Sequence, residues 1–259
     1  MPAPADDRLL LVLLPGLDGT GTMFAPLLKE LGDFETRVVR YPPALTSYPA
    51  CLHHARTFLP ADRPFLLLGE SFSGPVALAL AAERPEGLRA LILCGTFAKN
   101  PRPGLAWTAA LLRMLPARRL PRWLLRRLLL GPWATGPLLA LAQTLQAELP
   151  PATLKARLLS VLAVDQTPLL GRIQVPTLAL EADADRLVPP AATHWLRAHL
   201  PNLDLHRLHG PHWLLQTRPE AAAGALRGFL ERTGIAREGN PPRDGVGMPS
   251  AAMVGPAGR

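Results

Sequence analysis

The sequence predicts an α/β fold, in which a mostly parallel central sheet is covered by helices on both faces and carries a helical lid insert. Three observations lead to this prediction. Short apolar runs, of the length expected for buried strands, alternate with longer segments that have helical spacing. A proline-interrupted segment without strand character follows the fourth of these runs. The chain of 259 residues, 48% of them hydrophobic, is long enough for one large domain with an insert.

The expected strands are short apolar or strand-like runs, and the first two stop at turn-forming residues. The first ends at Pro15-Gly16, and the second, TRVVRY, ends at Pro42-Pro43. The six expected strands are residues 9–14, 36–41, 65–68, 90–94, 177–180 and 203–208. Segments with helical spacing lie between or after them. The expected helices are residues 24–31, 48–59, 72–83, 190–200 and 219–232.

Composition also divides the chain into regions. We expect residues 1–96 and 169–233 to form the core, and residues 97–168 to form the helical lid inserted into it. Within this lid, prolines separate several short helices, at positions 101, 103, 116, 121, 132 and 137. Residues 234–259 are rich in Gly and Pro and lack periodicity, so we expect a disordered tail there.

Residues suited to nucleophilic acyl transfer follow the expected strands. This chemistry needs an exposed hydroxyl, a base, an acid that orients the base, and backbone donors for the oxyanion. The carboxyl ends of parallel strands gather at one edge of a sheet. In GESFSG, Ser71 follows strand 65–68, and Gly69 and Ser73 are small enough for a sharp strand-to-helix turn. The alternative is an ordinary Gly/Ser turn that caps a helix.

The loop PGLDGTG after the first expected strand offers backbone N–H groups to the same edge. The N–H groups of Leu17 and Phe72 are the predicted oxyanion donors. The alternative is a nucleotide-binding glycine loop. The glycines at 16, 19 and 21 do not follow G-x-G-x-x-G, and no P-loop lysine follows them. We therefore expect no cofactor.

Acidic and histidine candidates follow the last two expected strands. Asp183 and Asp185 come after TLAL, where the alternative is a solvated acidic loop. The segment HRLHGPHW places His206 within a strand, His209 near its end and His212 in the loop beyond. Three histidines suggest zinc, but along an extended segment their spacing presents no single face, and no HExxH motif accompanies them. We therefore expect no metal site.

In chain order the candidates are Ser, Asp and His, and from Leu9 to about Arg232 the sequence resembles α/β-hydrolases. The resemblance is to the broad group that includes carboxylesterases and pimeloyl-acyl-carrier methyl ester esterases. It implies that Asp185, three positions before Val-Pro in DRLVP, is the triad acid, and that His212 in PHWLLQTRPE is the base. The chain departs from the family pattern in having Pro15 where histidine usually opens the oxyanion loop, and Ser73 where glycine is usual.

The expected lid is rich in large apolar residues. Trp107, Trp123 and Trp133, together with many leucines, predict an apolar acyl pocket. Trp213, beside His212, is a further candidate to contact the substrate.

The expected lid is also basic. No Asp or Glu occurs between Glu86 and Glu148, and the eight basic residues from Lys99 to Arg127 equal the net charge of +8. An acidic acyl-carrier protein or an anionic lipid surface would suit this charge. The alternative is a solvated arginine-rich face over a leucine core. No nucleic-acid-binding module is apparent, so we expect no nucleic-acid partner.

Together these features predict a serine hydrolase that cleaves carboxylic esters or thioesters of an apolar acyl chain through an acyl-enzyme. Two alternatives remain. One is an acyltransferase with the same triad, since certain plastid lipid acyltransferases carry a similar LPG-x-DGTG opening. The other is a non-catalytic relative that binds a ligand or partner.

The sequence also favours a cytoplasmic location. No apolar run approaches the roughly 18 residues of a transmembrane segment, and the first residues lack the basic start of a signal peptide. Cys51 and Cys94 show neither a disulfide pattern nor metal-binding spacing.

Overall fold

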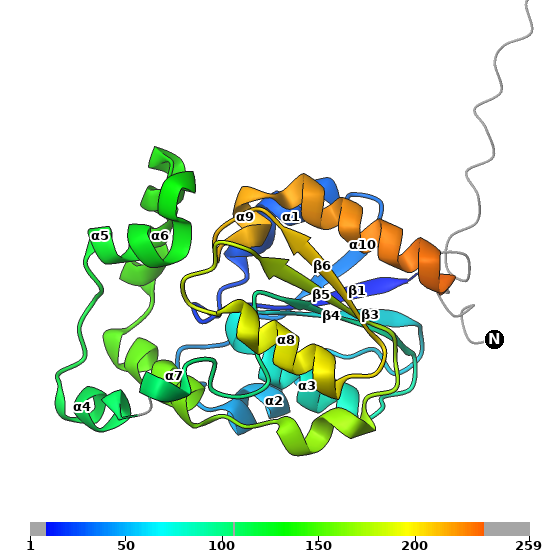
Figure 1. The fold of residues 1–259 in the computed structure, drawn as a ribbon, viewed down its shortest axis with the longest axis horizontal. Coiled ribbons are helices and arrows are strands. Elements are labelled where there is room, and N and C mark those ends of the chain that lie inside the picture. The colour runs from blue at the N-terminus through cyan, green and yellow to red at the C-terminus, as the bar shows by residue number, and fades with distance from the viewer. Residues whose placement is uncertain (1–8, 106, 236–259) are drawn as a thin grey trace, which may run out of the picture.

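A computed structural model of the protein describes residues 9–105 and 107–235, and at its centre is a six-stranded parallel sheet. Helices lie on both sides of the sheet (Figure 1), which confirms the predicted α/β fold class. The strand order is β2-β1-β3-β4-β5-β6. The strands are β1 (Leu10–Leu14), β2 (Glu35–Val38), β3 (Phe65–Glu70), β4 (Leu88–Cys94), β5 (Thr177–Ala182) and β6 (Leu203–Leu208).

The strands divide their apolar side chains between two hydrophobic cores, one on each face of the sheet. In β1, Leu10, Val12 and Leu14 belong to one core, and Leu11 and Leu13 belong to the other. The first face is covered by α2 (Tyr48–Arg56), α3 (Gly74–Ala82) and α8 (Pro190–His199). The second is covered by α1 (Ala25–Glu30), α9 (Leu214–Thr217) and α10 (Pro219–Thr233). Because both faces of the sheet are covered, β1 and β3 in its middle are buried at every position and appear in the sequence as apolar runs, whereas the edge strand β6 keeps exposed polar positions.

The order of the strands creates a crevice between β1 and β3. After β1 the chain adds β2 on one side, then returns to add β3 on the other. At such a reversal the connections leave in opposite directions, which opens a space beyond the carboxyl ends of the two strands. The glycine loop after β1 and Ser71 after β3 both lie there.

Several expected elements differ in extent from the structure, and two of these differences lie beside the glycine loop and Ser71. The second strand ends at Val38 instead of Tyr41, because beyond it the backbone turns toward the glycine loop. There the Tyr41 N–H donates a hydrogen bond of 2.8 Å to the carbonyl of Gly19. The helix expected from Phe72 begins as a 3-10 turn at Ser71–Ser73, and α3 follows only from Gly74.

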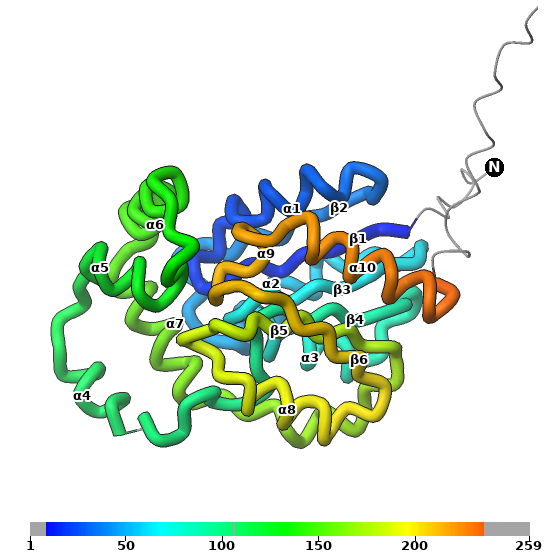
Figure 2. The backbone as a smooth tube through the Cα atoms, turned by 45° about the horizontal axis from the view of Figure 1, so that its top comes forward, coloured from blue at the N-terminus to red at the C-terminus, as the bar shows by residue number. Residues whose placement is uncertain are grey.

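Between β4 and β5, the regular elements of the described residues are all helical. Most of them lie beyond the end of the sheet toward which the strand arrows point in Figure 1, and Figure 2 shows the same arrangement in a second view. Lys99 and Asp165 form an isolated antiparallel bridge, so the chain leaves and re-enters the core at adjacent points. The main helices are α4 (Thr108–Met114), α5 (Arg122–Leu125), which continues as a π-helical turn at Arg126–Leu130, α6 (Gly136–Glu148) and α7 (Pro151–Ala163).

Most of the tail predicted at residues 234–259 lies outside the described residues, which end at Ile235. Gly234 ends α10 in a left-handed conformation, with φ of 77°. In residues 9–105 and 107–235, no helix has both the length and the apolar character needed to cross a membrane.

Candidate active site

Ser71 stands at the apex of a strained turn between β3 and α3. Its φ is +47°, in the left-handed region that non-glycine residues seldom adopt. The turn depends on close approach of its two arms. A Cβ atom at Gly69 would lie 2.7 Å from that of Ala77, and one at Gly74 would overlap the Thr96 side chain. The small residues of GESFSG thus let the turn close, and the turn presents the Ser71 hydroxyl at the edge of the sheet.

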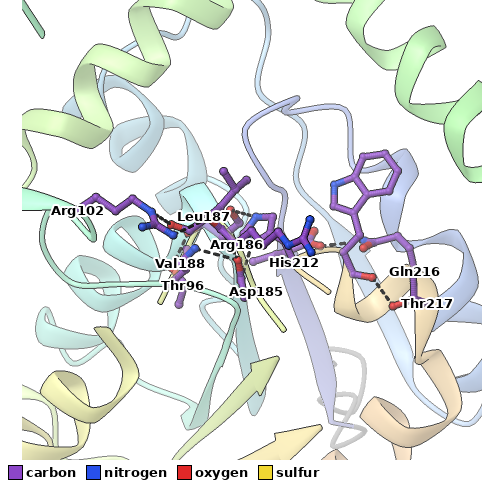
Figure 3. Close-up of polar contacts among 12 residues, drawn as sticks. Thr96, Arg102, Asp185, Arg186, Leu187, Val188, His212, Gln216 and Thr217 are labelled. Atoms are coloured by element: carbon purple, nitrogen blue, oxygen red, sulfur yellow. Dashed lines mark hydrogen bonds and ion pairs between the residues drawn. The ribbon is translucent and has the colours of Figure 1, made fainter. Parts of the chain in front are cut away.

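A continuous line of hydrogen bonds joins Ser71, His212 and Asp185. Ser71 Oγ lies 2.9 Å from His212 Nε2, and His212 Nδ1 lies 2.7 Å from Asp185 Oδ2. Asp185 lies in the loop after β5, and His212 in the loop between β6 and α9 (Figure 3). The backbone N–H groups of Leu187 and Val188 donate to Asp185 Oδ1, at 2.7 and 2.9 Å, and fix the carboxylate in place.

The surroundings of His212 set its protonation. Burial opposes the charged form, but the facing Asp185 carboxylate and the more distant Glu70 carboxylate outweigh it and raise the pKa of His212 above its ordinary value. Because Asp185 accepts at Nδ1, the proton of the neutral ring sits there. Nε2 is then left as an acceptor toward the Ser71 hydroxyl.

A second Asp–His pair lies close by along the same two loops. His209 Nδ1 lies 2.9 Å from Asp183 Oδ2, but the His209 side chain is 71% exposed and the Asp183 side chain is 37% exposed. The corresponding side-chain values for His212 and Asp185 are 6% and 2%. His206 is exposed on β6. The structure therefore brings one of the two acids and one of the three histidines to Ser71.

The two predicted oxyanion donors belong to the glycine loop and to the turn at Ser71. Leu17 belongs to a tight turn in which Gly19 N–H donates to Gly16 O at 3.1 Å, and Phe72 directly follows Ser71 at the start of the 3-10 turn. The buried Ser73 hydroxyl donates to the carbonyl of Pro15 and lies 3.2 Å from Tyr41 Oη. Ser73 thus ties the turn at Ser71 to the start of the glycine loop, where the usual histidine is absent.

Comparison with known proteins identifies the family. The model of a family described as "Serine aminopeptidase, S33", of the α/β-hydrolase type, matches residues 48–212. That range is more than half of the chain and contains Ser71, Asp185 and His212. The chain belongs to this family. It is therefore a hydrolase with the α/β-hydrolase fold, as the sequence predicted.

Relatives of this hydrolase include esterase-type enzymes. A pimeloyl-[acyl-carrier protein] methyl ester esterase of Neisseria meningitidis is 29% identical over 181 residues, which cover 66% of this chain and 71% of the relative. A putative carbamate hydrolase, RutD, of Variovorax paradoxus is 29% identical over 251 residues, 88% of this chain and 94% of the relative. The crystal structure of a hydrolase from Pseudomonas aeruginosa superposes with a TM-score of 0.74 at 21% identity, covering 86% of this chain and 90% of that one. The last match shows the fold alone.

The hydrolase has an apolar cavity of about 370 Å³ that opens onto Ser71 and His212. This volume lies toward the lower end of the range typical of small-molecule sites, about 300–1,000 Å³. Gly16, Leu17 and Trp213 are also part of its lining. Most of the remaining wall comes from the inserted helices: Leu120, Leu124, Leu125, Leu128, Leu129, Ala142, Leu145, Gln146, Leu149, Leu154 and Leu158.

Of the four tryptophans expected at the acyl pocket, the structure brings only Trp213 to the cavity lining. Trp107 and Trp123 are 68% and 66% exposed. On α5 the leucines that follow Trp123 turn toward the cavity, and the indole is left on the outer face. Trp133 packs edge-to-face on the ring of His209, with centroids 5.0 Å apart. Of the tryptophans and leucines predicted to line the pocket, the leucines therefore provide most of its wall.

Glu70 is a buried acid directly before Ser71, and the sequence did not reveal its environment. It is the last residue of β3 and lines the cavity. Burial raises the pKa of Glu70 to about 7, although Gln216 Nε2 donates a hydrogen bond of 2.9 Å to its carboxylate. Gln216 lies 146 positions away in α9, so no local sequence pattern predicts that the two residues form a hydrogen bond.

Proposed function

We propose that this hydrolase cleaves carboxylic esters or thioesters of an apolar acyl chain, through an acyl-enzyme on Ser71. The observation that carries the proposal is the line of hydrogen bonds from Ser71 through His212 to Asp185 at the mouth of an apolar cavity. A hydroxyl, a base and an orienting acid in this arrangement are the requirements of nucleophilic acyl transfer. A protein that only binds a ligand would not need to keep the hydroxyl, the base and the acid within hydrogen-bonding distance of one another.

In the proposed first half-reaction, Ser71 Oγ attacks the carbonyl carbon of the substrate while His212 Nε2 takes the hydroxyl proton. The carbonyl oxygen becomes an oxyanion, which the N–H groups of Leu17 and Phe72 stabilise. The tetrahedral intermediate collapses, the bond to the alcohol or thiol breaks, and His212 returns the proton to that leaving group. Asp185 stabilises the imidazolium form throughout.

In the second half-reaction, a water molecule takes the place of the leaving group. His212 accepts one of its protons as the oxygen attacks the acyl carbon. Collapse of the second tetrahedral intermediate breaks the bond to Ser71 Oγ, and His212 gives the proton back to the serine. Transfer to an alcohol in place of water would use the same groups, so the acceptor decides between hydrolase and acyltransferase activity.

The acyl-enzyme can be tested by letting methanol and water compete as acceptors of the acyl group. We expect p-nitrophenyl, phenyl and thiophenyl esters of one acyl group to yield the same ratio of methyl ester to free acid at a fixed methanol concentration, because they share one intermediate. Acid-quenched enzyme should carry a mass increase equal to the acyl group. A product ratio that changes with the leaving group, and no adduct, would contradict the proposal.

Chain length tests the assignment of the cavity. In a series of p-nitrophenyl esters from acetyl to palmitoyl, kcat/KM should rise from acetyl, as added methylenes bury apolar surface, and fall once the chain outgrows about 370 Å³. An acetyl optimum would place the acyl group elsewhere.

We further propose that the outer face of the insert docks on an anionic lipid surface. Among the described residues, the large hydrophobic side chains that are exposed all lie between residues 105 and 123, and six exposed arginines lie between 113 and 127. Clusters of this kind suit an interface of acyl chains and anionic headgroups. The exposed hydrophobic residues are Leu105, Trp107, Leu111, Met114, Leu115 and Trp123.

The part of the outer face on α5 lies directly over the proposed acyl site, whereas α4 lies apart from it, beside α7 (Figure 1). Along α5, Leu124 and Leu125 line the cavity, and Arg122 and Trp123 are exposed. One helix therefore separates the cavity from the docking face, which gives an apolar substrate a short route from a lipid surface to Ser71.

Vesicle binding distinguishes this partner from an acidic carrier protein. The hydrolase should bind vesicles containing phosphatidylglycerol more tightly than phosphatidylcholine vesicles, with binding that weakens as salt rises. The double substitution Arg122→Glu and Arg126→Glu should abolish the difference, whereas Arg197→Glu, at an exposed arginine on α8, should not. Equal binding to both vesicles, together with salt-sensitive turnover of an acyl-carrier ester, would instead identify the carrier protein as the partner.

A further inference from the structure

A fully buried arginine joins the inserted helices to the glycine loop. Arg157 extends from α7, and its relative exposure is 0%. The guanidinium has five N–H groups, and five backbone carbonyls accept from it. Nε donates to Leu45 at 3.0 Å, Nη1 to Leu17 at 2.8 Å and Asp18 at 3.1 Å, and Nη2 to Tyr41 at 3.3 Å and Pro42 at 3.1 Å.

None of these five bonds involves a carboxylate. A buried charge without an ionic partner is costly unless hydrogen bonds replace its lost hydration, and here every N–H has an acceptor. The carbonyl dipoles all point at one cation, so their positions depend on it. Pro42 O also accepts from Leu45 N–H at 2.9 Å. Removing the guanidinium would nevertheless take a donor from each of the five carbonyls and leave them repelling one another, and the segments that carry them would be less constrained.

Two of the carbonyls belong to the turn that carries a proposed oxyanion donor. Leu17 and Asp18 are the central residues of the turn closed by the hydrogen bond from Gly19 to Gly16. A Cβ atom at Gly19, where φ is +76°, would lie 2.6 Å from Arg157 Nη1. The second glycine of PGLDGTG thus leaves room for the guanidinium as well as supplying the backbone conformation.

The same guanidinium reaches the other proposed donor. Arg157 Cζ lies 5.9 Å from the centre of the Phe72 ring, which stacks on Tyr48 at 4.7 Å. Arg157 therefore contacts both residues whose backbone N–H groups would hold the oxyanion. On α7, Leu154 and Leu158 flank it on the cavity wall, so one helix carries both acyl-binding residues and the contact to the turn.

We propose that Arg157 is a positioning residue that holds the Leu17 and Phe72 donors in the geometry required by the oxyanion, and so makes catalysis depend on the docking of α7. This proposal rests on the proposed function, because it assigns Arg157 a part in stabilising the oxyanion. Arg157 does not itself touch the reacting atoms.

If Arg157 positions the oxyanion donors, replacing it should weaken stabilisation of the tetrahedral intermediate without weakening substrate binding. We expect Arg157→Ala to lower kcat on the order of 10²-fold, the lower end of the cost of losing one oxyanion donor, with little change in KM. Affinity for an alkyl trifluoromethyl ketone, which forms a tetrahedral adduct with the serine, should fall by a similar factor. Affinity for the matching alkyl methyl carbinol, which forms no oxyanion, should change far less. The lysine of Arg157→Lys offers three donors and no planar fork, so kcat and ketone affinity of this variant should lie between those of the wild type and of Arg157→Ala.

Matched controls come from the same helix. Thr153 Oγ1 donates to Pro43 O at 3.0 Å and Ser160 Oγ to Thr46 O at 2.9 Å, so these residues anchor α7 without touching the glycine turn. The double substitution Thr153→Val and Ser160→Ala should lower the melting temperature and leave the ratio of ketone to carbinol affinity unchanged. If it reproduces the kinetic loss of the Arg157 variants, Arg157 serves only to dock the helix, and the positioning role is wrong.

Chemical rescue covers the case in which the alanine variant is poorly folded. Free guanidinium, at concentrations far below those that unfold the wild-type enzyme, should restore kcat in Arg157→Ala and have no such effect on the control. If Arg157→Ala does not fold, the ketone-to-carbinol ratio of Arg157→Lys decides the question alone. An unchanged ratio there overturns the positioning role. A normal acyl-enzyme on Ser71 in these variants would show that the proposed function survives such a result.

Discussion

Replacing Ser71 with alanine is expected to abolish ester hydrolysis and labelling by a fluorophosphonate probe. Ser71 Oγ lies 2.9 Å from His212 Nε2, and its φ of +47° holds it at the apex of the turn. Without this hydroxyl the acyl-enzyme cannot form. Loss of a triad nucleophile typically costs about 10⁶-fold in kcat, and what remains reflects binding and the oxyanion donors. Steady-state kinetics and in-gel labelling measure the two effects.

Ser73→Ala is the matched control, because it removes the other hydroxyl of GESFSG. Ser73 Oγ is buried and lies against Pro15 O and Tyr41 Oη, so it has no route to a substrate. We expect labelling to persist and the free energy of unfolding to fall by about 1–3 kcal/mol, because the Pro15 carbonyl loses its donor. Labelling that survives in Ser71→Ala and disappears in Ser73→Ala would reverse the assignment of the nucleophile.

Replacing Asp185 with asparagine should lower kcat on the order of 10⁴-fold. Asp185 Oδ2 accepts from His212 Nδ1 at 2.7 Å, and an amide nitrogen in its place would favour the tautomer with the proton on Nε2. In that tautomer His212 cannot accept the Ser71 proton. Asp183→Asn is the control, since Asp183 makes the equivalent contact with exposed His209 at 2.9 Å. Equal losses in the two variants would contradict the choice of Asp185.

The same substitution should change the pH profile in a defined direction. Burial lowers the pKa of His212, but Asp185, together with the more distant Glu70, more than offsets this effect and raises it. In the wild-type enzyme, activity should therefore rise as pH increases through a pKa above the ordinary value of about 6.5 for histidine. Removing the charge at Asp185 should move this rise to lower pH. A profile of kcat/KM for both enzymes tests this, and an unchanged position would mean that Asp185 does not control His212.

The parts of the fold that could be predicted are those with a periodic or local cause. A strand buried on both faces must be apolar at every position, so β1 and β3 are visible as unbroken runs. The turn after β3 needs small residues at defined offsets from Ser71, and these are visible too. Because all strands are parallel, residues that follow different strands meet at one edge. This rule is enough to nominate Ser71, the Asp183–Asp185 loop and the histidine loop as neighbours.

Choices between adjacent candidates could not be made from periodicity alone. Asp183 and Asp185 both follow β5, and His209 and His212 both follow β6. What separates them is burial: the first Asp–His pair is exposed to solvent, and the second is enclosed beside Ser71. Burial depends on all the elements packed around a side chain, which a stretch of a few residues does not describe.

The wall of the cavity and the support of the glycine loop are consequences of tertiary packing. A tryptophan on a short amphipathic helix can face inward or outward, and Trp123 faces outward because Leu124 and Leu125 occupy the cavity side of α5. Arg157 meets Leu17 across 140 positions, and Glu70 meets Gln216 across 146. Sequence alone thus identified the strands, the turn at Ser71 and the edge of the sheet where the candidates meet, since each follows from local sterics or from strand direction. Contacts between distant segments depend on how the helices between β4 and β5, and those after β6, pack against the rest of the chain, and therefore emerge only in the folded molecule.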